Sequence, residues 1–94
     1  MVSNQQKEII KAVTKKLNPT FLGVFGSYAR GEENEHSDLD ILIDFGDKVD
    51  LLELIGVEQE LSELLGVKVD LITLRSLNRS LIPYIESDVI KLVG

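Results

Sequence analysis

Two short apolar runs, residues 21–25 and 39–45, enclose the stretch that most constrains this chain. The first run ends in a turn, Gly26-Ser27, and the second follows Asp38 and includes Asp40. Both runs have the length and composition of buried strands. Residues two apart in a strand point to the same face, so Asp38 and Asp40 are expected to project together, away from the core. The sequence therefore predicts a strand, a glycine turn and a pair of carboxylates, with the other residues as their scaffold.

The rest of the chain predicts an α/β (α+β) fold, a small mixed β-sheet packed with helices, in a single domain over residues 1–94. Gly56 lies inside the second long helix, where it indicates a kink or a close packing contact. Ser80 is the predicted N-cap of the last helix. The final strand is expected at a sheet edge. The predicted helices cover residues 4–17, 51–65 and 81–86, and the predicted strands cover 21–25, 39–45, 67–72 and 89–93.

The residue types around the turn fit a metal-bound polyphosphate. Two adjacent carboxylates repel each other, and a divalent cation relieves that repulsion. Mg²⁺ accepts one or two carboxylates and completes its shell with water and substrate phosphates. Gly26 has no Cβ and lets a phosphate approach the backbone, while Ser27 offers a hydroxyl and an N–H. Arg30 follows one helical turn later and is suited to a phosphate oxygen.

Asp70 interrupts the third predicted strand on the face opposite its apolar residues. If that strand neighbours the second, Asp70 completes a carboxylate triad that can hold a metal and accept a proton from an attacking hydroxyl. Each feature alone also has an ordinary explanation. A Gly-Ser pair is usually only a turn, Asp-x-Asp at a strand start is usually a solvated edge, and Asp70 fits a solvent-facing position equally well. The conjunction of all four in this order favours the functional interpretation.

Charge and composition exclude several classes of protein. The formal net charge of −6 argues against direct nucleic-acid binding, which needs a basic face to neutralise phosphates. The same charge requires a cation for any triphosphate and suits a basic protein partner. The chain contains no cysteine, no signal-peptide core and no apolar run long enough to cross a bilayer, so a cytoplasmic location is expected and no membrane partner.

The motif Gly26-Ser27, ten residues, Asp38-x-Asp40 resembles the nucleotidyltransferase superfamily of the DNA polymerase beta type. The fuller pattern is similar to the minimal nucleotidyltransferases of prokaryotes, the MNT family with its MntA-type antitoxins. The resemblance implies binding of a nucleoside triphosphate, here ATP, with two Mg²⁺ ions. It implies that Gly26 and Ser27 hold phosphates and that Arg30 contacts one. By the same resemblance Asp38, Asp40 and Asp70 are the catalytic, metal-binding carboxylates.

The resemblance further implies transfer of AMP to a tyrosine hydroxyl of a HEPN-domain ribonuclease toxin, which silences that toxin. The chain has little room beyond its core, so the acceptor is expected on a second chain. Two alternatives stay open at this stage. One is a non-catalytic antitoxin that binds and occludes the toxin, and the other is nucleotidyl transfer to a small molecule.

Overall fold

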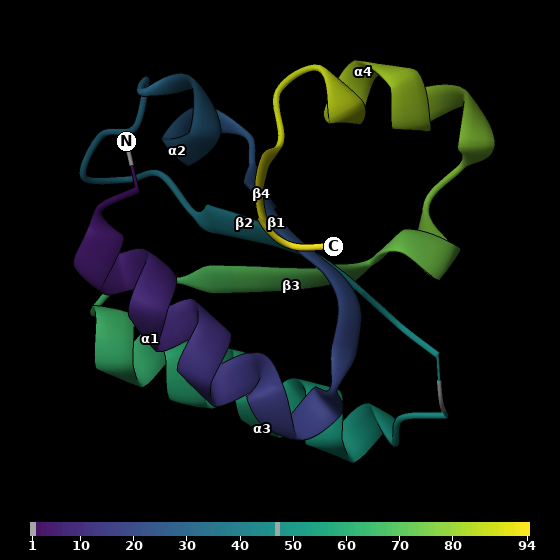
Figure 1. Ribbon diagram of the computed structural model, residues 1–94. Helices are drawn as coiled ribbons and strands as arrows, with labels where there is room; N and C mark the ends of the chain where they lie inside the picture. The colour runs from purple at the N-terminus through teal and green to yellow at the C-terminus, as the bar shows by residue number, and fades with distance from the viewer. Residues whose placement is uncertain (1, 47) are drawn as a thin grey trace.

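The computed structural model describes residues 2–46 and 48–94 (Figure 1). A four-stranded sheet carries helices on both faces, which confirms the mixed α/β fold. The helices are α1 (Asn4–Thr14), α2 (Ser27–Arg30), α3 (Leu51–Leu65) and α4 (Ile82–Glu86), with 3-10 turns η1 (Lys15–Leu17), η2 (Leu74–Ser76) and η3 (Arg79–Leu81). The strands are β1 (Pro19–Phe25), β2 (Leu39–Phe45), β3 (Val69–Thr73) and β4 (Ile90–Val93).

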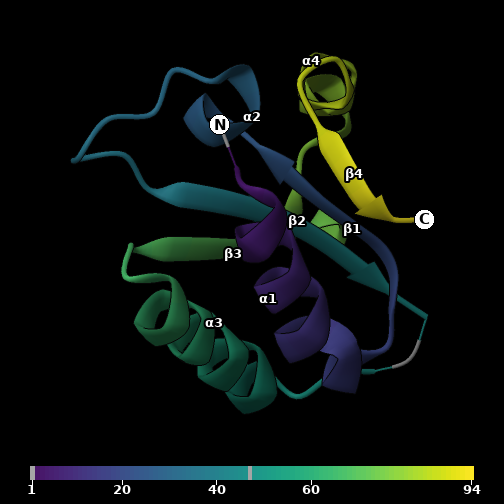
Figure 2. The same cartoon turned by 60° about the vertical axis from the view of Figure 1, so that its left-hand side comes forward.

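The strand order is β3-β2-β1-β4, so β4 lies at an edge as the sequence predicted. β1 runs antiparallel to both β2 and β4, whereas β2 and β3 are parallel. A parallel pair needs a crossover, and α3 supplies it between β2 and β3. Figures 1 and 2 show α1 and α3 side by side, with α4 at the far side of the sheet.

The alternation of β2 divides the sheet into a core face and a site face. Leu39, Ile41 and Ile43 are fully buried in the main apolar cluster with residues of α1 and α3. The intervening positions, Asp40 and Leu42, point to the opposite face. There Leu42 lines a pocket of about 390 Å³ beneath the residues of α4. The expected separation of core residues from carboxylates is therefore confirmed.

Local signals account for most helix ends. Ser3 and Gln6 form both hydrogen bonds of a capping box at the start of α1. The side chain of Asp50 accepts the N–H of Leu52 at the start of α3. Gly66 ends α3 in the left-handed conformation, at φ 70°. None of the helices described by the structure is long and apolar enough to cross a membrane.

Several sequence predictions need correction, since α1 ends at Thr14 rather than residue 17 and β1 begins at Pro19 rather than residue 21. α3 continues through Gly56, and a Cβ there would meet no atom within 4 Å, so the glycine marks no close packing contact. Ser80 lies inside η3 rather than capping α4, because Asn78 accepts the N–H of Ser80 and begins the turn two residues earlier. β3 spans Val69–Thr73 rather than residues 67–72, since its start is set by pairing of Val69 with Leu39.

Candidate active site

The Gly26 backbone lies directly against the carboxylate of Asp40. Gly26 has φ 79° and ψ −153°, a conformation that other residues rarely adopt. A Cβ placed on Gly26 would lie 2.5 Å from Asp40 Oδ2, far inside van der Waals contact. The contact follows from the antiparallel register that pairs Phe25 with Asp40. Only glycine therefore fits this turn while Asp40 keeps its position.

Asp70 stands beside Asp40 on the neighbouring strand. The parallel register of β2 and β3 pairs the two residues directly, which places both carboxylates on one face of the sheet. Partial burial raises the pKa of Asp40 above its usual value, and the charges of Asp70 and Asp38 raise it further, while Arg30 lowers it. The three other charged groups predicted for the site therefore act electrostatically on Asp40.

Asp38 precedes β2 and faces a cation. Its Oδ2 lies 3.9 Å from Nζ of Lys68, which precedes β3. The backbone joins the same two segments, because the N–H of Leu39 donates to the carbonyl of Lys68 at 2.8 Å. Both side chains are well exposed, so their ion pair is weak and is easily exchanged for another cation. The sequence suggested no such pairing for Asp38.

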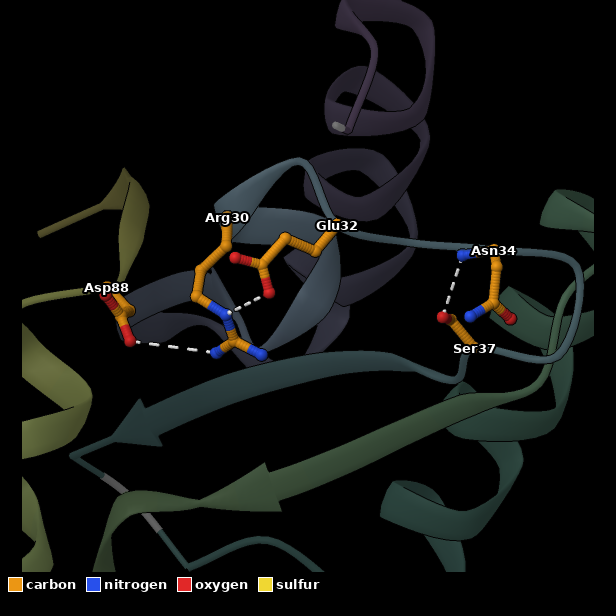
Figure 3. Close-up of polar contacts among 5 residues, drawn as sticks. All are labelled: Arg30, Glu32, Asn34, Ser37 and Asp88. Carbon is orange, nitrogen blue, oxygen red and sulfur yellow. Dashed lines mark hydrogen bonds and ion pairs between the residues drawn. The ribbon is translucent and has the colours of Figure 1, made fainter.

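Arg30 ends the single turn of α2 and makes two ion pairs (Figure 3). Its Nε lies 3.2 Å from Oε2 of Glu32, and its Nη1 lies 3.7 Å from Oδ2 of Asp88, in the segment between α4 and β4. Sequence reasoning missed both partners. Glu32 has the composition of a solvated loop, and the pairing with Asp88 joins segments far apart in the chain, for which the sequence holds no local signal.

The turn between β1 and β2 is held by its own hydrogen bonds. The carbonyl of Gly26 accepts the N–H groups of Ala29 and Arg30, each at 3.1 Å. Further along, the N–H of Asn34 donates to Oγ of Ser37 at 2.9 Å (Figure 3). The N–H of Ser37 in turn donates to the carbonyl of Asn34. The polar loop is thus organised at both ends, next to the carboxylates.

The donor set fits a hard divalent cation. Carboxylate oxygens from Asp38, Asp40 and Asp70 are the ligands that Mg²⁺ prefers, and the repulsion by Asp70 and Asp38, which helps burial to raise the pKa of Asp40, is one that a bound cation would offset. In residues 2–46 and 48–94 no three acidic, histidine or cysteine side chains already form a metal-binding cluster. Mg²⁺ needs only one or two carboxylates when phosphates and water complete its shell, so the arrangement suits a cation that arrives with a nucleotide.

The family of the chain follows from comparison with known proteins. A family model described as "Nucleotidyltransferase domain" matches residues 6–92. The chain therefore belongs to the nucleotidyltransferase family, as the resemblance of its central motif implied, and it is a nucleotidyltransferase.

Particular relatives agree with this assignment. The chain is 44% identical over 87 residues to the provisionally named protein adenylyltransferase MJ0126 of Methanocaldococcus jannaschii, a match that covers 88% of this chain and 86% of the relative. A crystal structure of a toxin–antitoxin with AMP-PNP matches at TM-score 0.80 and 29% identity, covering 98% of this chain and 74% of that one. An MNT antitoxin in complex with tri-AMPylated HEPN toxin of Shewanella oneidensis matches at TM-score 0.75 and 25% identity, covering 96% and 71%.

Proposed function

We propose that this chain is a Mg²⁺-dependent adenylyltransferase that moves AMP from ATP to a tyrosine hydroxyl of a HEPN-domain toxin and thereby acts as its antitoxin. The observation that carries the proposal is the packing of the Gly26 backbone against Asp40, with Asp70 paired alongside. That arrangement holds a phosphate-binding turn and two carboxylates at one point. The names of MJ0126 and of the two toxin–antitoxin structures support adenylyl transfer and a HEPN partner.

In this proposal the turn binds the triphosphate. Gly26 lets the turn lie against the carboxylate of Asp40, and Ser27, the first residue of α2, would offer its N–H and hydroxyl to the β- and γ-phosphates. The positive charge of Arg30 lowers the pKa of Asp40, so the two side chains act on each other electrostatically. We expect Arg30 to contact a phosphate oxygen in exchange for one of its weak ion pairs with Glu32 and Asp88.

Asp38, Asp40 and Asp70 would hold Mg²⁺, which when bound neutralises the phosphates and lowers the pKa of the acceptor hydroxyl. Asp70 accepts the proton of that hydroxyl. The hydroxyl oxygen then forms a bond to the α-phosphorus, and the bond from this phosphorus to the β-phosphate oxygen breaks, releasing pyrophosphate.

A protein acceptor is supported by charge as well as by the relatives. The chain carries a formal charge of −6, which favours a basic partner surface and faster association with it. We place the reaction in the cytoplasm, where ATP and Mg²⁺ are available. The proposal involves no nucleic acid or membrane.

The test is transfer of label from α-³²P-ATP to a HEPN-domain toxin supplied as the candidate partner, with Mg²⁺ present. We expect label on the toxin and loss of its ribonuclease activity. Asp40→Asn should abolish labelling, whereas Asp50→Asn, which preserves the N-cap of α3, should label normally. If Asp40→Asn still neutralises the toxin fully, the chain acts by occlusion and the enzymatic proposal is wrong. Label only on added small molecules would instead favour the small-molecule alternative.

A further inference from the structure

Side chains of α3 occupy the outer edge of β3. As an edge strand, β3 pairs with β2 on one side only. On its other side the N–H of Val69 donates to Oγ of Ser62 at 3.0 Å, and the N–H of Leu71 donates to Oε2 of Glu58 at 2.8 Å. All four residues are buried or half-buried. The edge amides are therefore satisfied from within the chain rather than left to solvent.

These two hydrogen bonds flank Asp70. The N–H of Leu71 belongs to the peptide group that carries the carbonyl of Asp70, and Val69 is the preceding residue. The bond to Glu58 is charge-assisted and hence stronger than one between neutral groups. Ser62 lies one turn after Glu58 on the same face of α3, and its hydroxyl donates to the carbonyl of Glu58 at 3.0 Å, which directs its lone pairs to Val69. The residues before and after Asp70 are thus both held by α3 at the outer edge of the strand.

The hydrogen bonds from Val69 to Ser62 and from Leu71 to Glu58, together called the clamp below, oppose the repulsion between the carboxylates of Asp70 and Asp40. Asp70 and Asp40 are direct neighbours of like charge, and an edge strand is the element that can most easily move away. We propose that Glu58 and Ser62 are positioning residues that keep Asp70 beside Asp40, so that one divalent cation can bind both carboxylates. The inference rests on the proposed function, since it assigns these residues to the metal site of that reaction.

A purely structural role would be the protection of the β3 edge from strand addition. That role and the positioning role differ in one measurable property. Edge protection leaves metal affinity unchanged, whereas displacement of Asp70 weakens it. Outer-shell partners of metal ligands typically change metal affinity by about 10- to 100-fold when removed.

The experiment compares Glu58→Ala, Glu58→Gln and Glu63→Ala. Glutamine keeps an acceptor oxygen for the N–H of Leu71, and Glu63 is an exposed residue of the same helix, so both serve as controls. Native-state hydrogen exchange reports the clamp itself, and we expect exchange of the Leu71 amide to rise about tenfold or more in Glu58→Ala only. Binding of Mn²⁺ together with α,β-methylene ATP reports the metal site without any transfer reaction. We expect about tenfold weaker Mn²⁺ binding in Glu58→Ala only.

Two results would overturn the inference, and they are distinguishable. If the wild type binds Mn²⁺ with the analogue and Glu58→Ala binds it equally well, then Glu58 only protects the edge. If the wild type binds no Mn²⁺ at all, the proposed function fails and the positioning role fails with it. Should Glu58→Ala not fold, Ser62→Ala tests the same inference, with faster exchange at Val69 and weaker Mn²⁺ binding as the supporting outcome.

Discussion

Replacement of Gly26 by alanine should damage both the fold and the site. The backbone conformation at φ 79° and ψ −153° costs a non-glycine residue about 1–3 kcal/mol. The added Cβ would lie 2.5 Å from Asp40 Oδ2, and relieving such overpacking costs typically about 1–3 kcal/mol more. We therefore expect Gly26→Ala to lower the free energy of unfolding by about 2–6 kcal/mol, a large part of the roughly 5–15 kcal/mol of a small domain. The proposed adenylyl transfer should fall about 100-fold or more, because Asp40 must move.

Urea unfolding of a double-mutant cycle separates the two contributions. In an Asp40→Ala background the obstructing carboxylate is gone, so Gly26→Ala should cost only the backbone contribution, about 1–3 kcal/mol. Gly66→Ala is the matched control, since Gly66 has φ 70° and open space around it. It should cost about 1–2 kcal/mol and leave transfer unchanged. The reasoning is refuted if Gly26→Ala costs the same in both backgrounds, or if it retains full activity.

Three further predictions concern stability. Gly56→Ala should raise the free energy of unfolding by about 0.5–1 kcal/mol, measured in urea, because the position is helical and has no neighbour within 4 Å; a loss would indicate a contact that the structure lacks. Asp50→Ala should cost about 1 kcal/mol through loss of the N-cap, and Asp50→Asn should cost almost nothing in the same assay. Asp40→Asn should stabilise the protein at pH 7, because burial and the neighbouring carboxylates raise the pKa of Asp40, so the folded state binds its proton more tightly than the unfolded chain does. Ionisation of Asp40 therefore lowers the free energy of unfolding as pH rises from about 3.9, the pKa in the unfolded chain, through the higher pKa in the folded state. The stability advantage of Asp40→Asn should vanish near pH 3, where Asp40 is protonated in both states, and an advantage independent of pH would contradict this cause.

The sequence predicted the elements whose signals are local. The bounds of β2 agree with its apolar run, and the single turn of α2 lies where the Gly-Ser turn suggested it. The helix caps at Ser3 and Asp50 likewise involve side chains within three residues of the amides from which they accept. Each of these signals resides within a few consecutive residues, so no knowledge of tertiary contacts is needed to recognise it.

The closeness of the candidate site residues was easier to predict than the contacts that support them. The motif predicted that Gly26 and Asp40 lie near each other, because their spacing is continuous in sequence, whereas Asp70 was expected beside Asp40 only if the third strand neighbours the second, as it does. It did not predict that Arg30 contacts Asp88, or that Glu58 holds the edge of β3. Both depend on how α4 and α3 pack against the sheet, and a single charged residue on a helix gives no sign of its partner. The same limit applies to Gly56, whose surroundings depend on tertiary packing.

Gly26, Asp40 and Asp70 meet at one end of the sheet because of the directions in which their strands run. β1 ends at Phe25 where β2 begins at Leu39, because the two strands are antiparallel, and the parallel start of β3 at Val69 lies at the same end of the sheet. Backbone pairing therefore sets the positions of Gly26 and of the two paired aspartates, Asp40 and Asp70. The ten residues between Ser27 and Asp38 connect the two strands and include Arg30. Their composition is therefore less constrained than the identity of the residues that flank them. The geometry most sensitive to substitution should accordingly lie in the strand register and its edge support, rather than in the polar loop.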